Sequence, residues 1–248
     1  MEHVEDYADD RLIQGCIHCG GRAETRDHMP SRAFLDAPFP EHLPGVGACL
    51  SCNNGFSADE EYLACLVEAA VAGTTDPKAM RRPSVQRAFA RSVKLRARLE
   101  AARYEEAGKT WFAPEQARVL NVVVKLARGH AAFELSQPCR EQPASVLCRP
   151  LITMSGQERE EFEEPYFPEI LPEVGSRASR RLMVIQPTLA GFGASVPVPG
   201  LMLQDWQEVQ KDRYSYLATD DGAEIRVRIL IGGYLACDVR WGKAVEAS

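Results

Sequence analysis

Apolar residues in the first half of the chain recur at the three- and four-residue spacing of helices. Residues 61–72, EYLACLVEAAVA, follow Ser57 and Glu60, which match the S-x-x-E capping box, and they precede the turn-like sequence GTTDP. This arrangement predicts a helix that begins just after Ser57 and ends before Gly73.

The following stretch predicts two more helices. Beyond Pro83, apolar or small residues recur every three or four positions, namely Val85, Ala88, Phe89, Ser92, Leu95, Leu99 and Ala102. This spacing predicts one continuous amphipathic helix. From Pro114, the segment ARVLNVVVKLARGHAAF is apolar around most of its circumference, so we expect a largely buried helix with His130 as a core residue.

Beyond Pro138 the pattern changes to short apolar runs separated by prolines and turns, as in RLMVIQ and SVPVPGLML. The segment YSYLATDDGAEIRVRIL contains two strand-like runs around Asp221-Gly222, which predicts a hairpin. ILIGGYLACDVRW has the character of a further strand or a buried helix. We therefore predict an α+β fold with a small N-terminal unit, a helical middle and a β-rich C-terminal half. We divide it into 1–75 and 76–248.

The overall composition adds little to the predicted fold, whereas the distribution of charge along the chain bears on function. The 248 residues are 45% hydrophobic and 26% charged, which is ordinary for a globular protein. No apolar run approaches the roughly 18 residues of a membrane span, and the acidic start MEHVEDYADD is unlike a targeting peptide. We expect a cytoplasmic protein without a membrane partner.

The net charge of −6 hides a strongly basic segment. Residues 81–103 contain seven arginines and one lysine against a single acid, Glu100. On the predicted helix, Arg87, Arg91, Lys94 and Arg98 step by four, three and four, so they would share one face. This face is a candidate surface for nucleic-acid phosphates. The alternative is a charged face that is only solvated.

Four cysteines form two C-x2-C pairs, Cys16/Cys19 and Cys49/Cys52, separated by 29 residues. Two such pairs suit tetrahedral zinc, because each short turn presents two thiolates on one side. A redox C-x2-C is the alternative, but it would need a flanking βαβ pattern that the sequence lacks; chance is another. The remaining cysteines, Cys65, Cys139, Cys148 and Cys237, are expected to be buried packing residues.

The segment between the cysteine pairs carries candidate chemistry in TRDHMPS, residues 25–31. Asp27 and Asn53 are oxygen donors of the kind that suits Mg²⁺ or Mn²⁺, and the imidazole of His28 can accept a proton near neutral pH. A divalent ion beside such a base can catalyse the hydrolysis of a phosphodiester bond. We expect His18, inside the first C-x2-C pair, to face solvent; the alternative is that it replaces a cysteine as a metal ligand.

At these residues the chain resembles the HNH, or ββα-metal, nucleases built on a zinc-bound treble clef. The motifs CIHCGGRAETRDHMPS and ACLSCNNGFS, within residues 16–62, carry the resemblance. It implies that Asp27 and Asn53 are ligands of a catalytic Mg²⁺ or Mn²⁺ and that His28 is the general base. It also implies that Cys16, Cys19, Cys49 and Cys52 hold a structural zinc.

We therefore expect a metal-dependent endonuclease that hydrolyses DNA, of the kind found in phage defence or mobile elements. We expect residues 76–248 to contribute dimerisation, substrate choice or contact with a regulatory partner. The alternative is a zinc treble clef that binds nucleic acid or protein without catalysis. No asparagine occurs from Met29 to Ala48, where the family carries its middle Asn, and this favours the alternative.

Overall fold

The computed structural model describes residues 15–169, 176–185, 188–191, 194–197 and 201–242. It confirms the α+β class, with helices concentrated in the first part of the chain and antiparallel strands in the C-terminal half. The acidic segment MEHVEDYADD lies outside the described residues. No helix among the residues described is both long enough and apolar enough to cross a bilayer.

The N-terminal unit is a small hairpin followed by a long helix. Strand β1 (Thr25–His28) pairs antiparallel with β2 (Gly45–Ala48), and the short helix η2 (Arg32–Phe34) lies between them. Helix α1 spans Leu50–Ala72 and ends at Gly73, which adopts the left-handed conformation that favours glycine. The predicted beginning near Ser57 is wrong, because Cys49 caps the helix earlier by accepting a bond from the Cys52 amide.

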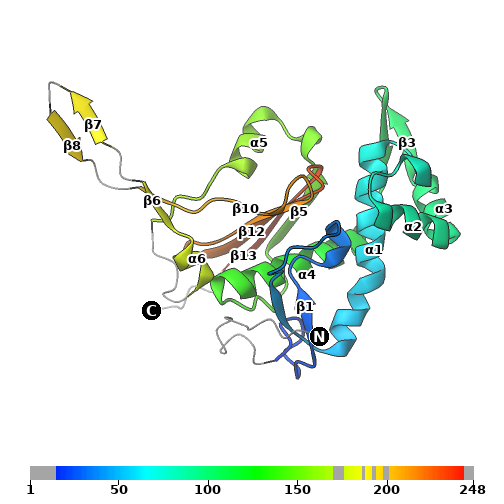
Figure 1. The fold of residues 1–248 in the computed structure, drawn as a ribbon, viewed down its shortest axis with the longest axis horizontal. Helices are drawn as coiled ribbons and strands as arrows, with labels where there is room; N and C mark the ends of the chain where they lie inside the picture. Colours follow the sequence, from blue (N-terminus) through cyan, green and yellow to red (C-terminus); the bar gives the residue numbers. More distant parts are fainter. Residues whose placement is uncertain (1–14, 170–175, 186–187, 192–193, 198–200, 243–248) are drawn as a thin grey trace.

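In Figure 1 the middle of the chain lies on the side of α1 that faces away from the C-terminal sheet. Its elements are η3 (Pro77–Ala79), α2 (Pro83–Arg91), α3 (Val93–Ala101) and the hairpin of β3 (Arg103–Glu106) with β4 (Lys109–Phe112). The expectation of one continuous helix is wrong. Ser92 leaves the helical conformation at φ −115°, and its hydroxyl caps α3 by accepting a bond from the Leu95 amide.

Helix α4 (Gln116–Leu135) is the buried helix that the sequence predicts, and it packs against both α1 and the C-terminal sheet. Five antiparallel strands form that sheet in the order β10-β11-β12-β13-β5. Their bounds are β5 (Ser145–Pro150), β10 (Gln207–Gln210), β11 (Tyr214–Asp220), β12 (Glu224–Ile231) and β13 (Leu235–Gly242). The predicted hairpin at Asp221-Gly222 joins β11 to β12 and is confirmed.

Helices cover both faces of this sheet, as Figure 1 shows for α4 and α5 (Gly156–Glu163). Because side chains alternate along a strand, β12 serves two cores. Val227 and Ile229 belong to the main core shared with α1 and α4, while Leu230 packs toward Phe162 of α5. The main core therefore continues across residue 75, where the sequence analysis places a domain boundary.

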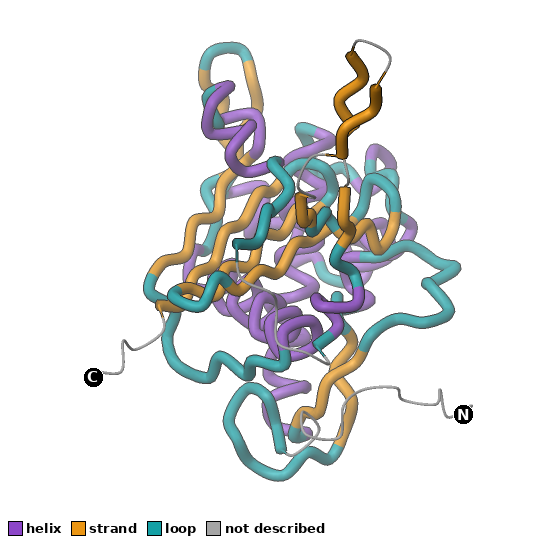
Figure 2. Tube along the Cα trace, turned by 90° about the vertical axis from the view of Figure 1, so that its left-hand side faces the viewer, coloured by secondary structure: helices purple, strands orange, loops and turns teal. Residues whose placement is uncertain are grey.

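Two short helices pack against the body of the protein: η4 (Leu151–Thr153) follows β5, and α6 (Arg177–Arg180) contacts α4. The remaining strands form an arm in two pairs, β6 (Met183–Ile185) with β9 (Leu201–Leu203) and β7 (Thr188–Gly191) with β8 (Ala194–Pro197). Figure 2 shows the strands of the main sheet side by side, with the β7–β8 hairpin standing apart from them.

Candidate functional site

The two cysteine pairs converge at the base of the β1–β2 hairpin. The Sγ atoms of Cys16, Cys19, Cys49 and Cys52 all lie within 4.8 Å of one another. A tetrahedral zinc with Zn–S bonds of about 2.3 Å separates its sulfurs by roughly 3.8 Å. The Cys19 and Cys49 sulfurs are 3.8 Å apart. The four thiols can therefore hold one metal ion such as zinc, as the spacing predicts.

Local backbone structure presents these sulfurs. The first pair occupies a tight turn in which the Gly20 amide donates to the Cys16 carbonyl, with Gly20 at φ +78°. The second pair lies at the beginning of α1, where Cys49 is the cap. Burial opposes the Cys16 thiolate, but hydrogen bonds from the backbone of Cys49, Cys19 and His18 lower the pKa of Cys16 to about 7. Such a lowered pKa favours the metal-binding form of the thiol.

The predicted catalytic pair lies in the middle of the hairpin. Asp27 pairs with Val46 across the two strands, and His28 pairs with Gly45. Because successive side chains of a strand point to opposite faces, Asp27 and His28 do not share a face. Asp27 is buried at 4% exposure, whereas His28 is half-buried.

Asn53 comes to β1 from the first turn of α1. Its amide nitrogen lies 3.4 Å from both the Thr25 hydroxyl and the Arg26 carbonyl oxygen, so it donates toward the beginning of the strand. The structure therefore brings Asn53 to the Thr25–Arg26 end of the strand that carries Asp27.

Asp27 is held by two buried donors that come from different elements. Its Oδ1 is 2.7 Å from Lys125 Nζ of α4, and its Oδ2 is 3.1 Å from His18 Nε2. Lys125 also binds Glu60 of α1 at 2.7 Å. Burial alone would raise the pKa of Asp27, but the bond from His18 and the charge of Lys125 lower it below its usual value.

Two residues that contact Asp27, His18 and Lys125, differ from what the sequence predicts. His18 is only 8% exposed, so the expectation that it faces solvent is wrong; its ring lies between Asp27 and Phe56. Lys125 was not identified from the sequence. Its signal was a single lysine inside the apolar segment VVVKLARG, because a buried lysine requires a partner.

A divalent ion at Asp27 and Asn53 does not fit these side chains as they stand. Both carboxylate oxygens of Asp27 already accept bonds from buried donors, and one of those donors is a cation. An ion at Oδ1 would have to share the space with the Lys125 ammonium, which repels it. The four thiols, by contrast, lie close enough to one another to hold a metal ion.

His28 has the protonation state that a general base needs. Burial lowers the pKa of His28, and the positive charge of Arg32 adds to the effect. Its Nδ1 atom is buried and has no hydrogen-bond partner among the described residues. The lowered pKa favours the neutral imidazole at neutral pH.

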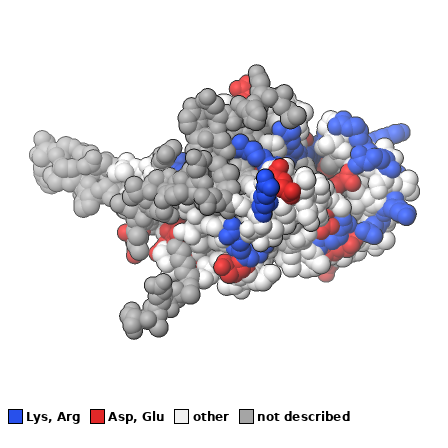
Figure 3. Space-filling view, turned by 90° about the horizontal axis from the view of Figure 1, so that it is seen from below, with Lys and Arg blue, Asp and Glu red and all other residues white. Residues whose placement is uncertain are grey.

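The predicted basic face extends over two helices rather than one. Arg87, Arg91, Lys94 and Arg98 are all exposed, but the break at Ser92 separates the first two from the others. Arg91 forms an ion pair with Glu61, and Arg98 pairs with Glu115 at 3.3 Å. Figure 3 shows Lys and Arg side chains gathered at the end of the molecule where Figure 1 places α2 and α3.

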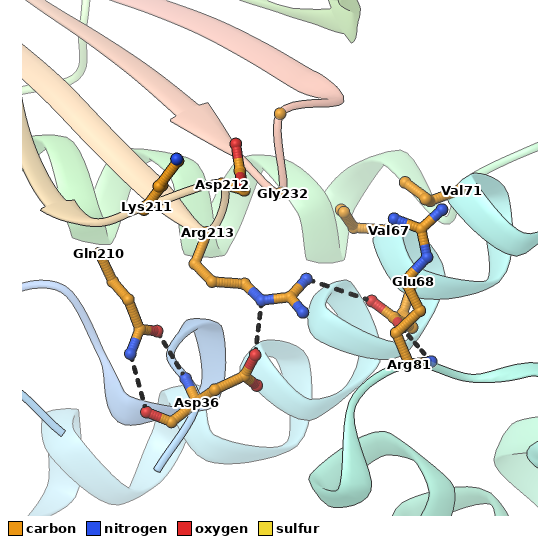
Figure 4. A pocket seen from close by; sticks show the side chains of 11 residues that line it. Asp36, Val67, Glu68, Val71, Arg81, Gln210, Lys211, Asp212, Arg213 and Gly232 are labelled. Atoms are coloured by element: carbon orange, nitrogen blue, oxygen red, sulfur yellow. Dashed lines mark hydrogen bonds and ion pairs between the residues drawn. The ribbon is translucent and has the colours of Figure 1, made fainter. Parts of the chain in front are cut away.

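A cavity of about 580 Å³ lies between α1 and two turns of the C-terminal sheet. Figure 4 shows Arg213 between Asp36 and Glu68, with its Nε 2.5 Å from Asp36 and its Nη1 3.9 Å from Glu68. Asp36 also binds Arg82 at 2.8 Å. These acids are thus matched by arginines, and the cluster ties the segment after η2 to the sheet.

Comparison with known proteins adds no relative. No family model matches the chain, and no curated protein or solved structure is significantly similar to it.

Proposed function

We propose that the chain is an endonuclease of the HNH type that hydrolyses phosphodiester bonds in DNA. One arrangement carries the proposal. The Asp27-His28 pair lies on a hairpin whose base holds the four cysteines, and α1 brings Asn53 from the second cysteine pair to the same hairpin. Order along the chain agrees with the resemblance, and the fold brings Asn53 to the strand that carries Asp27 and His28.

In this proposal the cysteine site holds zinc and has a structural task. The hairpin has strands of only four residues each, and two-stranded hairpins are marginally stable alone. A metal that joins the turn at Cys16 to the beginning of α1 fixes the hairpin against the helix. The metal thereby holds His28 in a constant position relative to α1.

His28 is the general base of this proposal. Its imidazole is neutral at neutral pH, so it accepts a proton from water as the water attacks phosphorus. The P–O3′ bond breaks as the new P–O bond forms, the leaving 3′ oxygen takes a proton from solvent, and protonated His28 releases its own proton to solvent. If the chemistry of the family applies, the products carry 5′-phosphate and 3′-hydroxyl ends.

The basic residues of α2 and α3 supply the contacts with DNA. Arg87 and Lys94 are exposed and are in no ion pair with a described residue, so they are available to phosphates. Arg91 and Arg98 would first have to leave Glu61 and Glu115. Counterion release makes such binding strongly dependent on salt.

A second function is supported by the contacts of Asp27. A carboxylate that is buried and bound to Lys125 and His18 is a structural group, and the middle Asn of the family is missing. These observations favour a treble-clef module that binds nucleic acid or protein without cutting it. Conversion of supercoiled plasmid to nicked circles separates the two functions.

The zinc-loaded protein is expected to nick plasmid, tested with and without added Mg²⁺ or Mn²⁺. Retention of plasmid in a gel shift without nicking under any of these conditions would favour the binding module. Metal analysis of the same sample should find about one zinc per chain. Cys49→Ser should lose the zinc, whereas Cys65→Ser, which changes a buried cysteine away from the site, should retain it.

A further inference from the structure

Lys125 lies at the centre of a buried ionic cluster whose members come from three elements. Its side chain is 1% exposed, and its Nζ is 2.7 Å from one oxygen of Asp27 and 2.7 Å from one oxygen of Glu60. The carboxylates belong to β1 and α1, and the lysine belongs to α4. A buried ammonium is costly unless it is paired, and here two acids pair with it.

The position of this ammonium is one that a divalent ion could take. Carboxylate oxygens bind Mg²⁺ or Ca²⁺ at about 2.0–2.6 Å, so a shift of a few tenths of an ångström would convert the contacts into coordination bonds. His18 contacts Oδ2 of Asp27, the oxygen that Lys125 does not bind, and the Phe56 ring lies 5.8 Å from the ammonium. The surroundings are closed, so a second cation beside Lys125 would be unscreened.

The charges of the cluster also disfavour a divalent ion beside Lys125. Asp27 and Glu60 contribute two negative charges, and Lys125 neutralises one of them. A divalent ion added beside the ammonium would bring the cluster to a net charge of +1 in a buried place. The same ion in the absence of the ammonium would neutralise the pair.

We propose that the Lys125 ammonium takes the place of a divalent ion between Asp27 and Glu60, and that this carboxylate pair becomes a divalent-metal site when the ammonium is removed. The inference goes beyond the proposed function, because it concerns the cation bound by Asp27 and requires no nuclease activity. It assigns Asp27 to an internal cation, so the folded chain binds no divalent ion there.

The test is binding of Mn²⁺ to the zinc-loaded protein, measured by the loss of the free-ion signal in electron paramagnetic resonance. The wild type should show no Mn²⁺ binding that depends on Asp27. Lys125→Ala, which removes the charge and leaves room for an ion, should bind one Mn²⁺ per chain at least about tenfold more tightly than the wild type. Adding Glu60→Gln to that variant should abolish the gain.

Thermal unfolding gives a second readout. Mn²⁺ should raise the melting temperature of Lys125→Ala but not that of the wild type, because an ion stabilises only a fold that binds it. Lys125→Met, which removes the charge but fills the space, should bind Mn²⁺ no better than the wild type. Lys109→Ala, at an exposed position of β4, is the matched control.

Two results would overturn the inference. One is a wild-type protein that binds one Mn²⁺ which Asp27→Asn abolishes, and this result needs no Lys125 variant to fold. The other is a folded Lys125→Ala protein whose Mn²⁺ affinity equals that of the wild type. No DNA is present in either experiment, so the result can be interpreted even if the protein is not a nuclease.

Discussion

Lys125 Nζ lies 2.7 Å from Asp27 Oδ1, and the two side chains are 1% and 5% exposed. The contact joins α4 to the hairpin that carries the candidate catalytic pair, across 98 positions of the chain. The hairpin is therefore held at its base by the cysteines and in its middle by this ion pair.

Asp27→Asn should destabilise the protein, because it leaves Lys125 with a single buried carboxylate partner. Breaking one contact of a buried ion pair costs about 3 kcal/mol or more. Urea unfolding followed by circular dichroism measures the change. Glu106→Gln, at an exposed position of β3, is the control and should stay within about 0.5 kcal/mol of the wild type. Equal stability of the two variants would show that the Asp27–Lys125 contact contributes nothing.

Gly129→Ala should disturb the same hairpin by crowding. A Cβ at this glycine of α4 would lie 1.8 Å from the sulfur of Met29, which is fully buried next to His28. Overpacking of this kind costs about 1–3 kcal/mol. Met29→Ala in the same chain should recover part of that loss, and this coupling distinguishes crowding from a general effect on the helix.

Gly55→Ala is the matched control for that substitution. Gly55 lies in α1, and a Cβ there would meet nothing within 4 Å. Because alanine favours helix over glycine, this change should stabilise the protein by up to about 1 kcal/mol. A destabilised Gly55→Ala together with a neutral Gly129→Ala would contradict the packing described here.

Stability should fall in acid because of His130. Burial, with the charges of Lys125 and Arg181, lowers the pKa of His130 to about 3. The unfolded chain binds this proton near pH 6.5 and the folded chain only near pH 3. The stability that the neutral His130 maintains is therefore complete above about pH 6.5 and declines as the pH falls, by up to about 1.4 kcal/mol per unit.

Urea unfolding at several pH values between 7.5 and 5 measures this decline. His130→Gln removes the titrating group, so the free energy of unfolding of that variant should fall less steeply with acid than that of the wild type. Parallel curves for the two proteins would mean that His130 is not the source. The same histidine accepts or donates a bond to Tyr214 at 2.7 Å, so a uniform loss of stability is also expected.

Much of the fold could be predicted from the sequence because its signals are local. The α4 helix and the hairpin at Asp221-Gly222 follow from periodicity and turn chemistry. The cysteine cluster follows from the two C-x2-C pairs, because each short turn presents two thiols to one ion. The two errors about helices are also local in origin. Ser57 matched a capping box inside a longer helix, and Ser92 interrupted a regular apolar stripe.

The contacts of the candidate site could not be predicted in the same way. The position of Lys125 in an apolar segment indicates that it needs a buried partner. The sequence does not indicate that the partners are Asp27 and Glu60. The burial of His18 depends on Asp27 and Phe56, which only the folded chain brings beside it. Such contacts arise from tertiary packing and leave no periodic pattern.

Reversal of charge on α2 and α3 should weaken DNA binding across all sequences. Arg87→Glu with Lys94→Glu removes two exposed cations, and each lost phosphate contact should reduce the slope of log affinity against log salt by about 1. Fluorescence anisotropy with a short duplex at several salt concentrations measures the slope. Arg159→Glu with Lys211→Glu, away from these helices, is the control. An unchanged slope in the α2–α3 variant would show that this face is only solvated.

We propose that His28 is the general base of DNA cleavage, and the decisive measurement is the rate of plasmid nicking by His28→Ala. His42→Ala, an exposed histidine of the same inter-cysteine segment, is the control. His28→Ala should lose at least about a hundredfold in nicking rate, because the proton of the attacking water then has no positioned acceptor. Its zinc content, melting temperature and DNA affinity should stay near those of His42→Ala. Equal nicking rates for the two variants under every divalent ion tested, or no nicking by the wild type, would contradict it.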